Sequence, residues 1–414
     1  LNAGREIAAD RVKLAANNNL TLRAGNGITA GQTELKGENV ELLAREGDIR
    51  MPMGGDNSRI SAGNNVQMFA SHKLDLQGIL FDKANNMTLN AGHEIAADRV
   101  KLAANNNLTL IAGKDITARQ AELKGENVEL LVHEGDIHMG WNQSDTLLPS
   151  ISADNHLRIS AGNDLDLFGT QLNKSHNLTL SAGRNLNASR SQLNAAGNIH
   201  LLAGNDLMLR RARISAGQQV MLSAGHDIDL SRPNTPEASE SLFYLSESYG
   251  LDKLAELKER MTPVDLSELS TQVTAGDHLQ LSAGGDIAGM ARLTSTQGNI
   301  SVNAGRDLVF SAQKYSPIND GDKHALYATG AVNAAQHLTL VAAGNLLTAG
   351  TRLTSGRDMW LSAGGNIRFE SRQEFIREGN IERFTQHASR LNSGGALTIR
   401  SQGSILFQAT ALIA

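Results

Sequence analysis

Residues that often carry out chemistry occur in this chain, but their spacing does not build a catalytic centre. His133 and His138 flank Glu134 and Asp136, and these ligand types would suit a metal ion. An earlier copy of the same segment has arginine at both histidine positions, so the segment folds without imidazole there. We therefore expect solvated corner residues here. The sequence predicts no metal site and no cofactor.

Paired carboxylates are the second candidate for chemistry, as in Asp164 with Asp166 and Asp227 with Asp229. A carbohydrate-cleaving site needs two acids across a groove and usually aromatic side chains against the sugar. These pairs instead recur at one place in a repeat, where aspartate is useful for turns. We predict no catalytic residue. A β-helix enzyme that degrades polysaccharide remains the alternative from another class.

The elements that would position these residues form a repeat built around the dipeptide Ala-Gly. Its glycines recur at a spacing of 21 wherever no insertion intervenes, as in the series Gly162, Gly183, Gly204 and Gly225. A short alternating strand such as Leu178–Leu180 comes before each Ala-Gly. Period-two alternation places one face inward and one outward. We expect the glycine to allow a sharp bend with positive φ.

This pattern predicts an all-β fold, a right-handed parallel β-helix (β-solenoid) with coils of about 21 residues. The chain would hold about 16 to 18 coils in one continuous stack. Asn-rich corners at 17–19 and 105–107 suit stacking of side chains between coils. Residues 1–50 also match 89–138 at 41 of 50 positions, an 88-residue block duplication that a solenoid tolerates easily.

Composition excludes several other classes of protein. The 414 residues include no cysteine and only 4% aromatics, so disulfides, zinc-thiolate sites and thiol catalysis are excluded. A net charge of −5 gives no sign of the basic patch that nucleic-acid binding uses. No stretch reaches the ~18 apolar residues of a membrane span. The chain starts at Leu1 inside a repeat, and we expect any targeting segment to lie outside it.

Breaks in the repeat divide the chain into three parts. Solenoid repeats cover 1–231, a helical insertion covers 232–273, and later-type repeats cover 274–414 with a hairpin excursion at about 367–394. The insertion has leucines at helical spacing and a Thr-Pro-Val-Asp helix start at 262–265. It is either a flap packed on the solenoid or a module that binds a partner.

Candidate partner-binding residues are the aromatic and apolar side chains in these breaks, because interfaces concentrate their energy in such anchors. Three lie in the insertion, three in loops that end the two block copies, and two in a smaller break at about 312–330. They are Phe243, Tyr244, Tyr249, Trp141, Met51, Met53, Tyr315 and Tyr327.

The recurring coil resembles a known repeat. The pattern Leu-x-Leu-x-Ala-Gly-x-x-Ile/Leu, as in 279–287 and 359–367, is similar to the filamentous haemagglutinin repeat of two-partner secretion exoproteins. The excursion and the repeats after it look most like those of contact-dependent growth-inhibition effectors of the CdiA type. The resemblance covers nearly the whole chain outside 232–273.

The resemblance implies a non-enzymatic, rigid extracellular stalk segment of a secreted adhesin or toxin-delivery effector, displayed on the outer surface of a Gram-negative bacterium. It implies two partners: the outer-membrane two-partner secretion transporter of the producing cell and an outer-membrane receptor on a target bacterium. It does not distinguish this role from that of a filamentous adhesin without a toxin. Any toxic activity would lie in a separate C-terminal domain.

Overall fold

The computed structural model describes residues 1–52, 58–77, 79–82, 84–141, 147–231, 270–315, 324–378 and 381–414. The chain forms two compact units. Unit 1 consists of Leu1–Ile228 and Thr274–Gly284, and unit 2 of Asp229–Val273 and Gly285–Ala414. None of the described residues forms a helix, and none forms a helical span long and apolar enough to cross a membrane.

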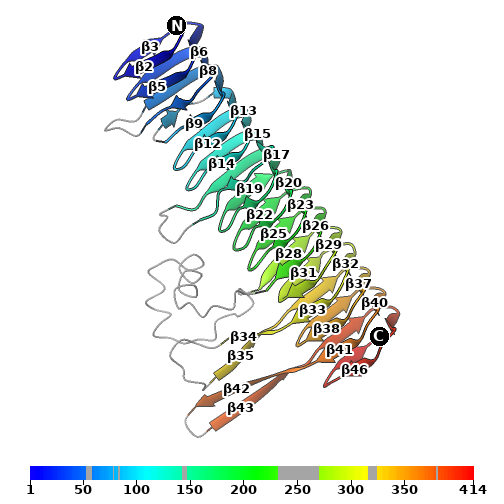
Figure 1. Cartoon of the computed structure of the whole chain (residues 1–414). Helices are drawn as coiled ribbons and strands as arrows, with labels where there is room; N and C mark the ends of the chain where they lie inside the picture. Colours follow the sequence, from blue (N-terminus) through cyan, green and yellow to red (C-terminus); the bar gives the residue numbers. More distant parts are fainter. Residues whose placement is uncertain are drawn as a thin grey trace. The chain divides into compact units, whose positions relative to one another are not determined.

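One coil of unit 1 shows how the repeat folds. Strands β20 (Asn177–Ala182), β21 (Leu186–Asn187) and β22 (Gln192–Ala195) follow one another with bends between them. The next coil begins with β23 (Ile199–Ala203), which pairs with β20 in parallel and places Leu178 beside Ile199, 21 residues on. Figure 1 shows the strands of unit 1 stacked in this way from blue to green. The predicted parallel β-solenoid is confirmed.

The alternation along each strand separates the core from the surface. Leu178 and Leu180 are 1% and 0% exposed, whereas Thr179 between them is exposed. Leucine, isoleucine, valine and alanine fill the interior of unit 1 at the same positions of successive coils. Burying a leucine or isoleucine side chain contributes roughly 1.5–3 kcal/mol, so the stack of coils is held by this narrow core.

Unit 1 contains two parallel sheets. The larger one has, besides β20, β22 and β23, the strands β1 (Asn2–Ala3), β3 (Lys13–Ala15), β4 (Asn19–Ala24), β6 (Glu34–Ala44), β8 (Ser58–Ala70), β10 (Ile79–Phe81), β11 (Ala84–Ala91), β13 (Lys101–Ala112), β15 (Glu122–Val132), β17 (Ser150–Ala161), β19 (Gln171–Ser175), β25 (Arg213–Ala216), β26 (Val220–Ala224) and β29 (Leu279–Ala283). The smaller one has, besides β21, the strands β2 (Glu6–Asp10), β5 (Gly27–Gly31), β7 (Ile49–Arg50), β9 (Lys73–Asp75), β12 (Glu94–Ala96), β14 (Asp115–Thr117), β16 (Ile137–His138), β18 (Leu165–Asp166) and β24 (Leu207–Met208).

The Ala-Gly glycines are required for close approach of backbones rather than for a bend. A Cβ atom on Gly204 would lie 2.0 Å from the carbonyl oxygen of Gly183 in the preceding coil. Among the described glycines, those with positive φ do not belong to the 21-residue Ala-Gly series. The expectation of positive φ at these glycines was therefore wrong. The left-handed corner lies elsewhere in the coil, at Gly169, Arg190 and Arg211, with φ of 68°, 58° and 56°.

The large insertion leaves the register of the stack intact. It follows β27 (Ile228–Leu230) and precedes β28 (Thr271–Ala275). After it, β29 pairs with β26, with Leu279 beside Val220. Residues 232–269 lie outside the described residues, so the expected helices are not described, and residues 271–273 at the end of the expected insertion are part of β28.

Unit 2 repeats the coil architecture. Its parallel strands are β30 (Ile287–Gly289), β31 (Ala291–Ser295), β32 (Ile300–Ala304), β33 (Leu308–Ser311), β36 (Ala331–Ala334), β37 (Leu338–Ala342), β38 (Leu346–Ala349), β39 (Arg352–Ser355), β40 (Met359–Ala363), β41 (Ile367–Glu370), β44 (Arg390–Ser393), β45 (Leu397–Ser401), β46 (Ile405–Phe407) and β47 (Ala411–Ile413). Phe310 and Phe369, at 2% and 0% exposure, are the largest fully buried side chains of this unit.

Two hairpins leave the coils of unit 2 and join each other. They are β34 (Gln313–Tyr315) with β35 (His324–Ala328), and β42 (Arg372–Glu378) with β43 (Ile381–His387). The second lies within the excursion expected at about 367–394. Strands β35 and β42 pair antiparallel, which gives a four-stranded sheet in the order β34-β35-β42-β43 (Figure 1). Each hairpin lengthens its coil, so that β32 pairs with β37 at an offset of 38 residues, Ile300 beside Leu338.

Candidate functional site

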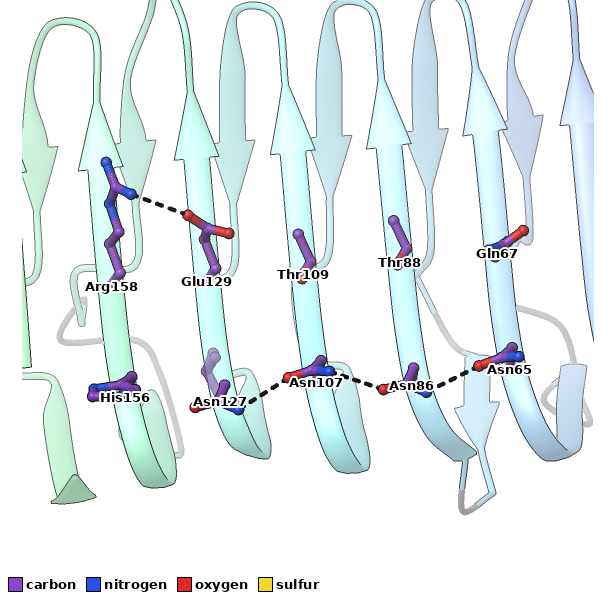
Figure 2. Close-up of a pocket in the computed structure, with 11 residues that line it drawn as sticks. Asn65, Gln67, Asn86, Thr88, Asn107, Thr109, Asn127, Glu129, His156 and Arg158 are labelled. Atoms are coloured by element: carbon purple, nitrogen blue, oxygen red, sulfur yellow. Dashed lines mark hydrogen bonds and ion pairs between the residues drawn. The ribbon is translucent and has the colours of Figure 1, made fainter. Parts of the chain in front are cut away.

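A polar groove of about 750 Å³ lies on the outward face of the larger sheet of unit 1. Five neighbouring strands supply its walls, β8, β11, β13, β15 and β17 (Figure 2). The side chains that line the groove point outward because residues along each strand alternate between the two faces of the sheet. Leu89 and Leu110 point into the core, so the residues next to them face solvent. The lining residues are Asn65, Gln67, Asn86, Thr88, Asn107, Thr109, Asn127, Val128, Glu129, His156 and Arg158.

One side of the groove is an asparagine ladder. The Asn107 Nδ2 group donates to Oδ1 of Asn86 at 3.0 Å, and Asn127 donates to Asn107 at 3.0 Å. The ladder continues from Asn86 through Asn65 to Asn39 and Asn19 with distances of 2.9–3.0 Å. Each amide side chain in the middle of the ladder both donates and accepts. The predicted stacking of the Asn-rich corners is confirmed for Asn19 and Asn107.

The other side of the groove is a row two residues further along the same strands. It consists of Gln67, Thr88, Thr109, Glu129 and Arg158. Arg158 Nη1 lies 3.6 Å from Glu129 Oε1, and both side chains are partly exposed. Glu129 is the one carboxylate in the lining. The groove thus presents hydrogen-bonding groups at one coil spacing, about 4.8 Å, without the pair of acids that glycoside hydrolysis uses.

A second ladder runs along a bend of unit 1 and explains the recurring aspartates. The Asp115 Oδ1 atom accepts the backbone N–H of Asp136 at 2.9 Å, and Asp136 accepts that of Asp164 at 2.9 Å. The same bond links Asp164 to Asn185 at 3.0 Å and Asp206 to Asp227 at 3.1 Å. These acids therefore hold consecutive coils together. The turn role expected for the recurring aspartates is seen at Asp166 and Asp229, which accept the backbone N–H groups of Phe168 and Ser231 two residues further on.

An arginine side chain neutralises part of the negative charge of this ladder. Arg184 Nη2 lies 2.6 Å from Asp164 Oδ2. The hydrogen bond from Arg184 holds the pKa of Asp164 below its usual value, against the opposing effect of desolvation, and the backbone N–H of Asn185 lowers it further. The same pairing raises the pKa of Arg184.

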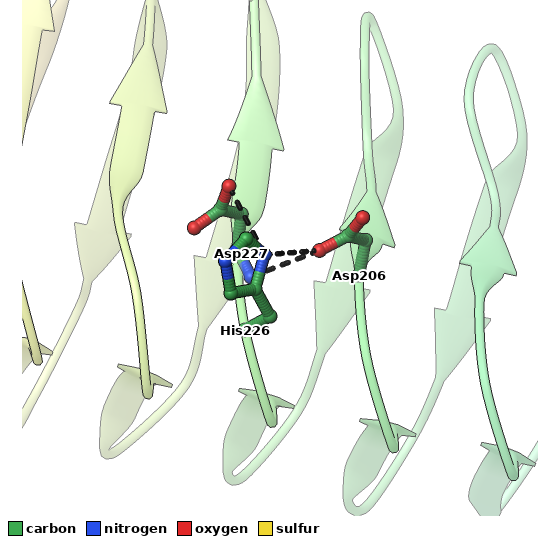
Figure 3. Close-up of side chains that lie close together, drawn as sticks. All are labelled: Asp206, His226 and Asp227. Carbon is green, nitrogen blue, oxygen red and sulfur yellow. Dashed lines mark hydrogen bonds and ion pairs between the residues drawn. The ribbon is translucent and has the colours of Figure 1, made fainter.

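His226 occupies the position of Arg184 two coils later. Figure 3 shows its side chain with those of Asp206 and Asp227. Its Nδ1 atom lies 3.0 Å from Asp206 Oδ1 and 3.3 Å from Asp227 Oδ2. Among the described residues this trio is the group with the geometry to hold a metal ion. The histidines considered from the sequence do not form such a group there: His138 Nε2 lies 3.7 Å from Asp136 Oδ2.

The structure corrects the role of Met51 among the predicted partner-binding residues. Its side chain is 0% exposed, because its backbone continues the coil and its N–H donates to the carbonyl of Asp75 at 2.8 Å. Met51 is thus a core residue and does not form an exposed loop tip. Trp141 is half-buried, and its backbone N–H donates to the backbone carbonyl of Phe168 at 2.6 Å.

The other predicted residues are not brought together with these. Tyr315 lies in β34 and half-buried Tyr327 in β35, both in unit 2. The remaining four predicted residues, Met53, Phe243, Tyr244 and Tyr249, lie outside the described residues.

Sequence reasoning missed an aromatic pair on the antiparallel sheet. Phe375 of β42 and Phe384 of β43 are directly opposite each other, with ring centroids 6.4 Å apart, and Phe384 is 60% exposed. Tyr327 lies one strand away, and its backbone N–H donates to Glu374 Oε2 at 3.1 Å. The signal was present in the sequence as two strand-like segments close together in the chain, and the register of β42 with β43 places Phe375 opposite Phe384.

Comparison with known proteins gives one family match. Residues 264–380 match a family model described as hemagglutinin repeat. No curated protein and no solved structure matches the chain. The matched segment covers β28 to β42 and includes both β34–β35 and the strand that carries Phe375. This segment is similar to the hemagglutinin repeat, in support of the resemblance inferred from the sequence.

Proposed function

We propose that this chain is a stalk segment of a secreted, adhesin-type protein on the surface of a Gram-negative bacterium. The observation that carries the proposal is the hemagglutinin-repeat match over residues that fold as stacked parallel coils. A stack of coils transmits load through backbone hydrogen bonds between every pair of neighbours. Such a segment projects a binding surface away from a cell without needing any chemistry of its own.

The solenoid coils are suited to be the support rather than the anchor. Their outward rows are largely polar or charged, as in the groove row of Gln67, Thr88 and Thr109. Exposed polar contacts contribute little to affinity, whereas well-packed aromatic anchors dominate it. The recognition element is therefore expected on a segment that leaves the coils.

Among the described residues, the antiparallel sheet of unit 2 fits this role best. Phe384, Phe375 and Tyr327 come from three adjacent strands of this sheet, and the Phe384 ring is the most exposed. On the same face of β43, two residues before and after Phe384, lie the exposed side chains of Glu382 and Gln386, which would form the polar rim of an interface. The insertion at 232–273 remains the other candidate recognition element.

In its more specific form, the proposal is that the stalk belongs to a contact-dependent growth-inhibition effector. Its partners are then the outer-membrane transporter that exports it and an outer-membrane receptor on a neighbouring bacterium. A filamentous adhesin without a toxin is the second candidate, because the same match supports both. Growth of target bacteria mixed with cells that display the whole protein distinguishes the two roles.

Hydrolysis of polysaccharide is less well supported. Its mechanism uses two carboxylates on either side of the scissile bond. The groove of unit 1 offers Glu129, which already pairs with Arg158.

Binding of the fluorescently labelled chain to target Gram-negative cells tests the proposal. We expect saturable binding that falls at least tenfold in Phe384→Ser, a loss of about 1.4 kcal/mol. The control is Trp360→Ser, which also removes an exposed aromatic ring, 42% exposed, but from coil strand β40. Both variants are checked for unchanged melting temperature. Binding that is unsaturable, or that both variants reduce equally, contradicts the proposed recognition role.

A further inference from the structure

The trio Asp206, His226 and Asp227 combines one imidazole with two carboxylates at the surface of unit 1. Asp206 lies one coil before His226 and Asp227, and the two coils are fixed by the bond from the Asp227 N–H to Asp206 Oδ1 at 3.1 Å. Figure 3 shows the imidazole lying between the two carboxylates, with Nδ1 facing both. One ring nitrogen can donate a hydrogen bond along only one direction, so a hydrogen bond accounts for one of these two approaches.

The two imidazole–carboxylate distances are close to those between ligands around a tetrahedral ion. Zinc binds imidazole nitrogen at about 2.0–2.1 Å and carboxylate oxygen at about 2.0–2.2 Å, which separates neighbouring ligand atoms by about 3.3–3.5 Å. The Nδ1 atom of His226 lies 3.0 Å from Asp206 Oδ1 and 3.3 Å from Asp227 Oδ2. All three ligand atoms lie within 4.8 Å of one another. The two imidazole–carboxylate distances thus lie within a few tenths of an ångström of the tetrahedral separation, and an approach of the two carboxylates to about 3.3–3.5 Å would place all three atoms at corners of a tetrahedron.

Two other coils carry arginine at this position and show how it pairs with the stacked acids. Arg184 follows the coil glycine as His226 does, and it pairs with Asp164 at 2.6 Å. Arg306 does the same in unit 2, at 3.3 Å from Asp286, with Asp307 next to it. Arginine neutralises the stacked acids but cannot ligate a metal, because it has no acceptor. At His226 the permanently charged guanidinium group is replaced by an imidazole, which can bind a metal ion.

We propose that Asp206, His226 and Asp227 form a binding site for a divalent transition-metal ion of the zinc class. Imidazole with carboxylate is a donor set that suits zinc, whereas calcium and magnesium prefer oxygen alone. The ion bridges two consecutive coils and neutralises two carboxylates that otherwise repel each other across the coil spacing. It does so in the last coil before the insertion at 232, so it stabilises the coil from which that segment departs. This inference does not depend on the proposed adhesin function.

The chain itself provides matched variants for the test. His226→Arg recreates the arrangement of Arg306 with its two acids, so it should fold normally and lose the site. Arg306→His creates the converse set of one imidazole and two carboxylates, and should gain a site. Arg184→His serves as the control, because Asn185 stands where the second carboxylate would be.

The experiment is titration of the full chain with Zn²⁺, followed by calorimetry, with Co²⁺ absorption reporting the ligand set. We expect the wild type to bind one more ion than His226→Arg, Arg306→His to bind one more than wild type, and Arg184→His to bind at least tenfold more weakly at its new position. The melting temperature should rise with Zn²⁺ in wild type more than in His226→Arg. Equal zinc stoichiometry and affinity in wild type and His226→Arg, both with native circular dichroism, would overturn the proposal and leave His226 as an ion-pair partner of Asp206.

Discussion

Replacement of Gly204 by alanine isolates the contact that lets the coils stack. The new Cβ would lie 2.0 Å from the carbonyl oxygen of Gly183 and 2.8 Å from its carbon, whereas ordinary contact begins at 3.4 Å. Both are backbone atoms, so a side-chain rotation cannot relieve the overlap. The two coils must separate by about 1.4 Å at this point, the difference between 3.4 and 2.0 Å.

That separation breaks neighbouring hydrogen bonds. The Gly204 N–H donates to Ala182 at 2.9 Å and the Asn205 N–H to Arg184 at 2.7 Å, and neither bond survives such a shift. Two lost bonds cost about 1 kcal/mol each and overpacking costs about 1–3 kcal/mol. The stiffer unfolded chain opposes this with a gain of about 0.4–1 kcal/mol, so the net loss of stability is about 2–5 kcal/mol. Urea unfolding followed by circular dichroism measures it.

Gly4→Ala is the matched control. Gly4 has the same Ala-Gly setting, but nothing lies within 4 Å of its Cβ position and its φ is not in the left-handed region. The same substitution there should leave stability unchanged or raise it by up to about 1 kcal/mol. Equal destabilisation by both variants would refute close stacking as the reason for glycine, and would point instead to a conformational requirement shared by the whole series.

Further substitutions test the core, the asparagine ladder and the ion pair at Asp164. Leu180→Asp places a charge in the core and should cost more than about 3 kcal/mol, whereas Thr179→Asp beside it should stay within about 0.5 kcal/mol; similar melting temperatures would contradict the inward assignment. Asn107→Ala removes two ladder bonds and should cost about 1–2 kcal/mol in urea unfolding, and a neutral result would mean that the ladder adds nothing to stability. Arg184→Ala should raise the pKa of Asp164 in an NMR titration. The folded-state pKa of Asp164 is lowered, so its ionised carboxylate stabilises the fold above the unfolded pKa of about 3.9, and this stabilisation is lost as the pH falls through the folded pKa. The variant should therefore have a lower free energy of unfolding than wild type at neutral pH and the same free energy of unfolding in acid.

The regular part of the fold was predictable from the sequence because its signals are local and repeated. Spacing of 21 sets the coil, and alternation around Leu178 and Leu180 sets the buried face. The positions with positive φ were harder to predict from the sequence. Glycine is the usual residue for positive φ, yet here Arg190 and Arg211 adopt it while Gly204 is needed for its missing Cβ. Sequence alone does not separate these two uses of glycine.

The candidate sites depended on distant contacts and were less predictable. The pairing of β35 with β42 brings Ala325 beside Phe375 across 50 residues, so no local pattern indicated the four-stranded sheet. Met51 looked like part of an exposed loop tip, but the coil continues through it into the core. His226 was not singled out, because its neighbour Asp206 lies one coil away rather than next to it in sequence.

The most direct test of the coil register is engineered cysteine pairing, which the cysteine-free chain permits. Thr179, His200 and Met221 stand in line on three successive coils of unit 1, with outward side chains. At about 4.8 Å per coil, cysteines at 179 and 200 lie within disulfide range, whereas those at 179 and 221 are about 9.6 Å apart, beyond the roughly 7 Å limit. We expect rapid and complete oxidation of the first pair and none of the second within one chain. Cross-linking of 179 to 221, or failure of 179 to 200 in the folded protein, would contradict the stacked 21-residue coil.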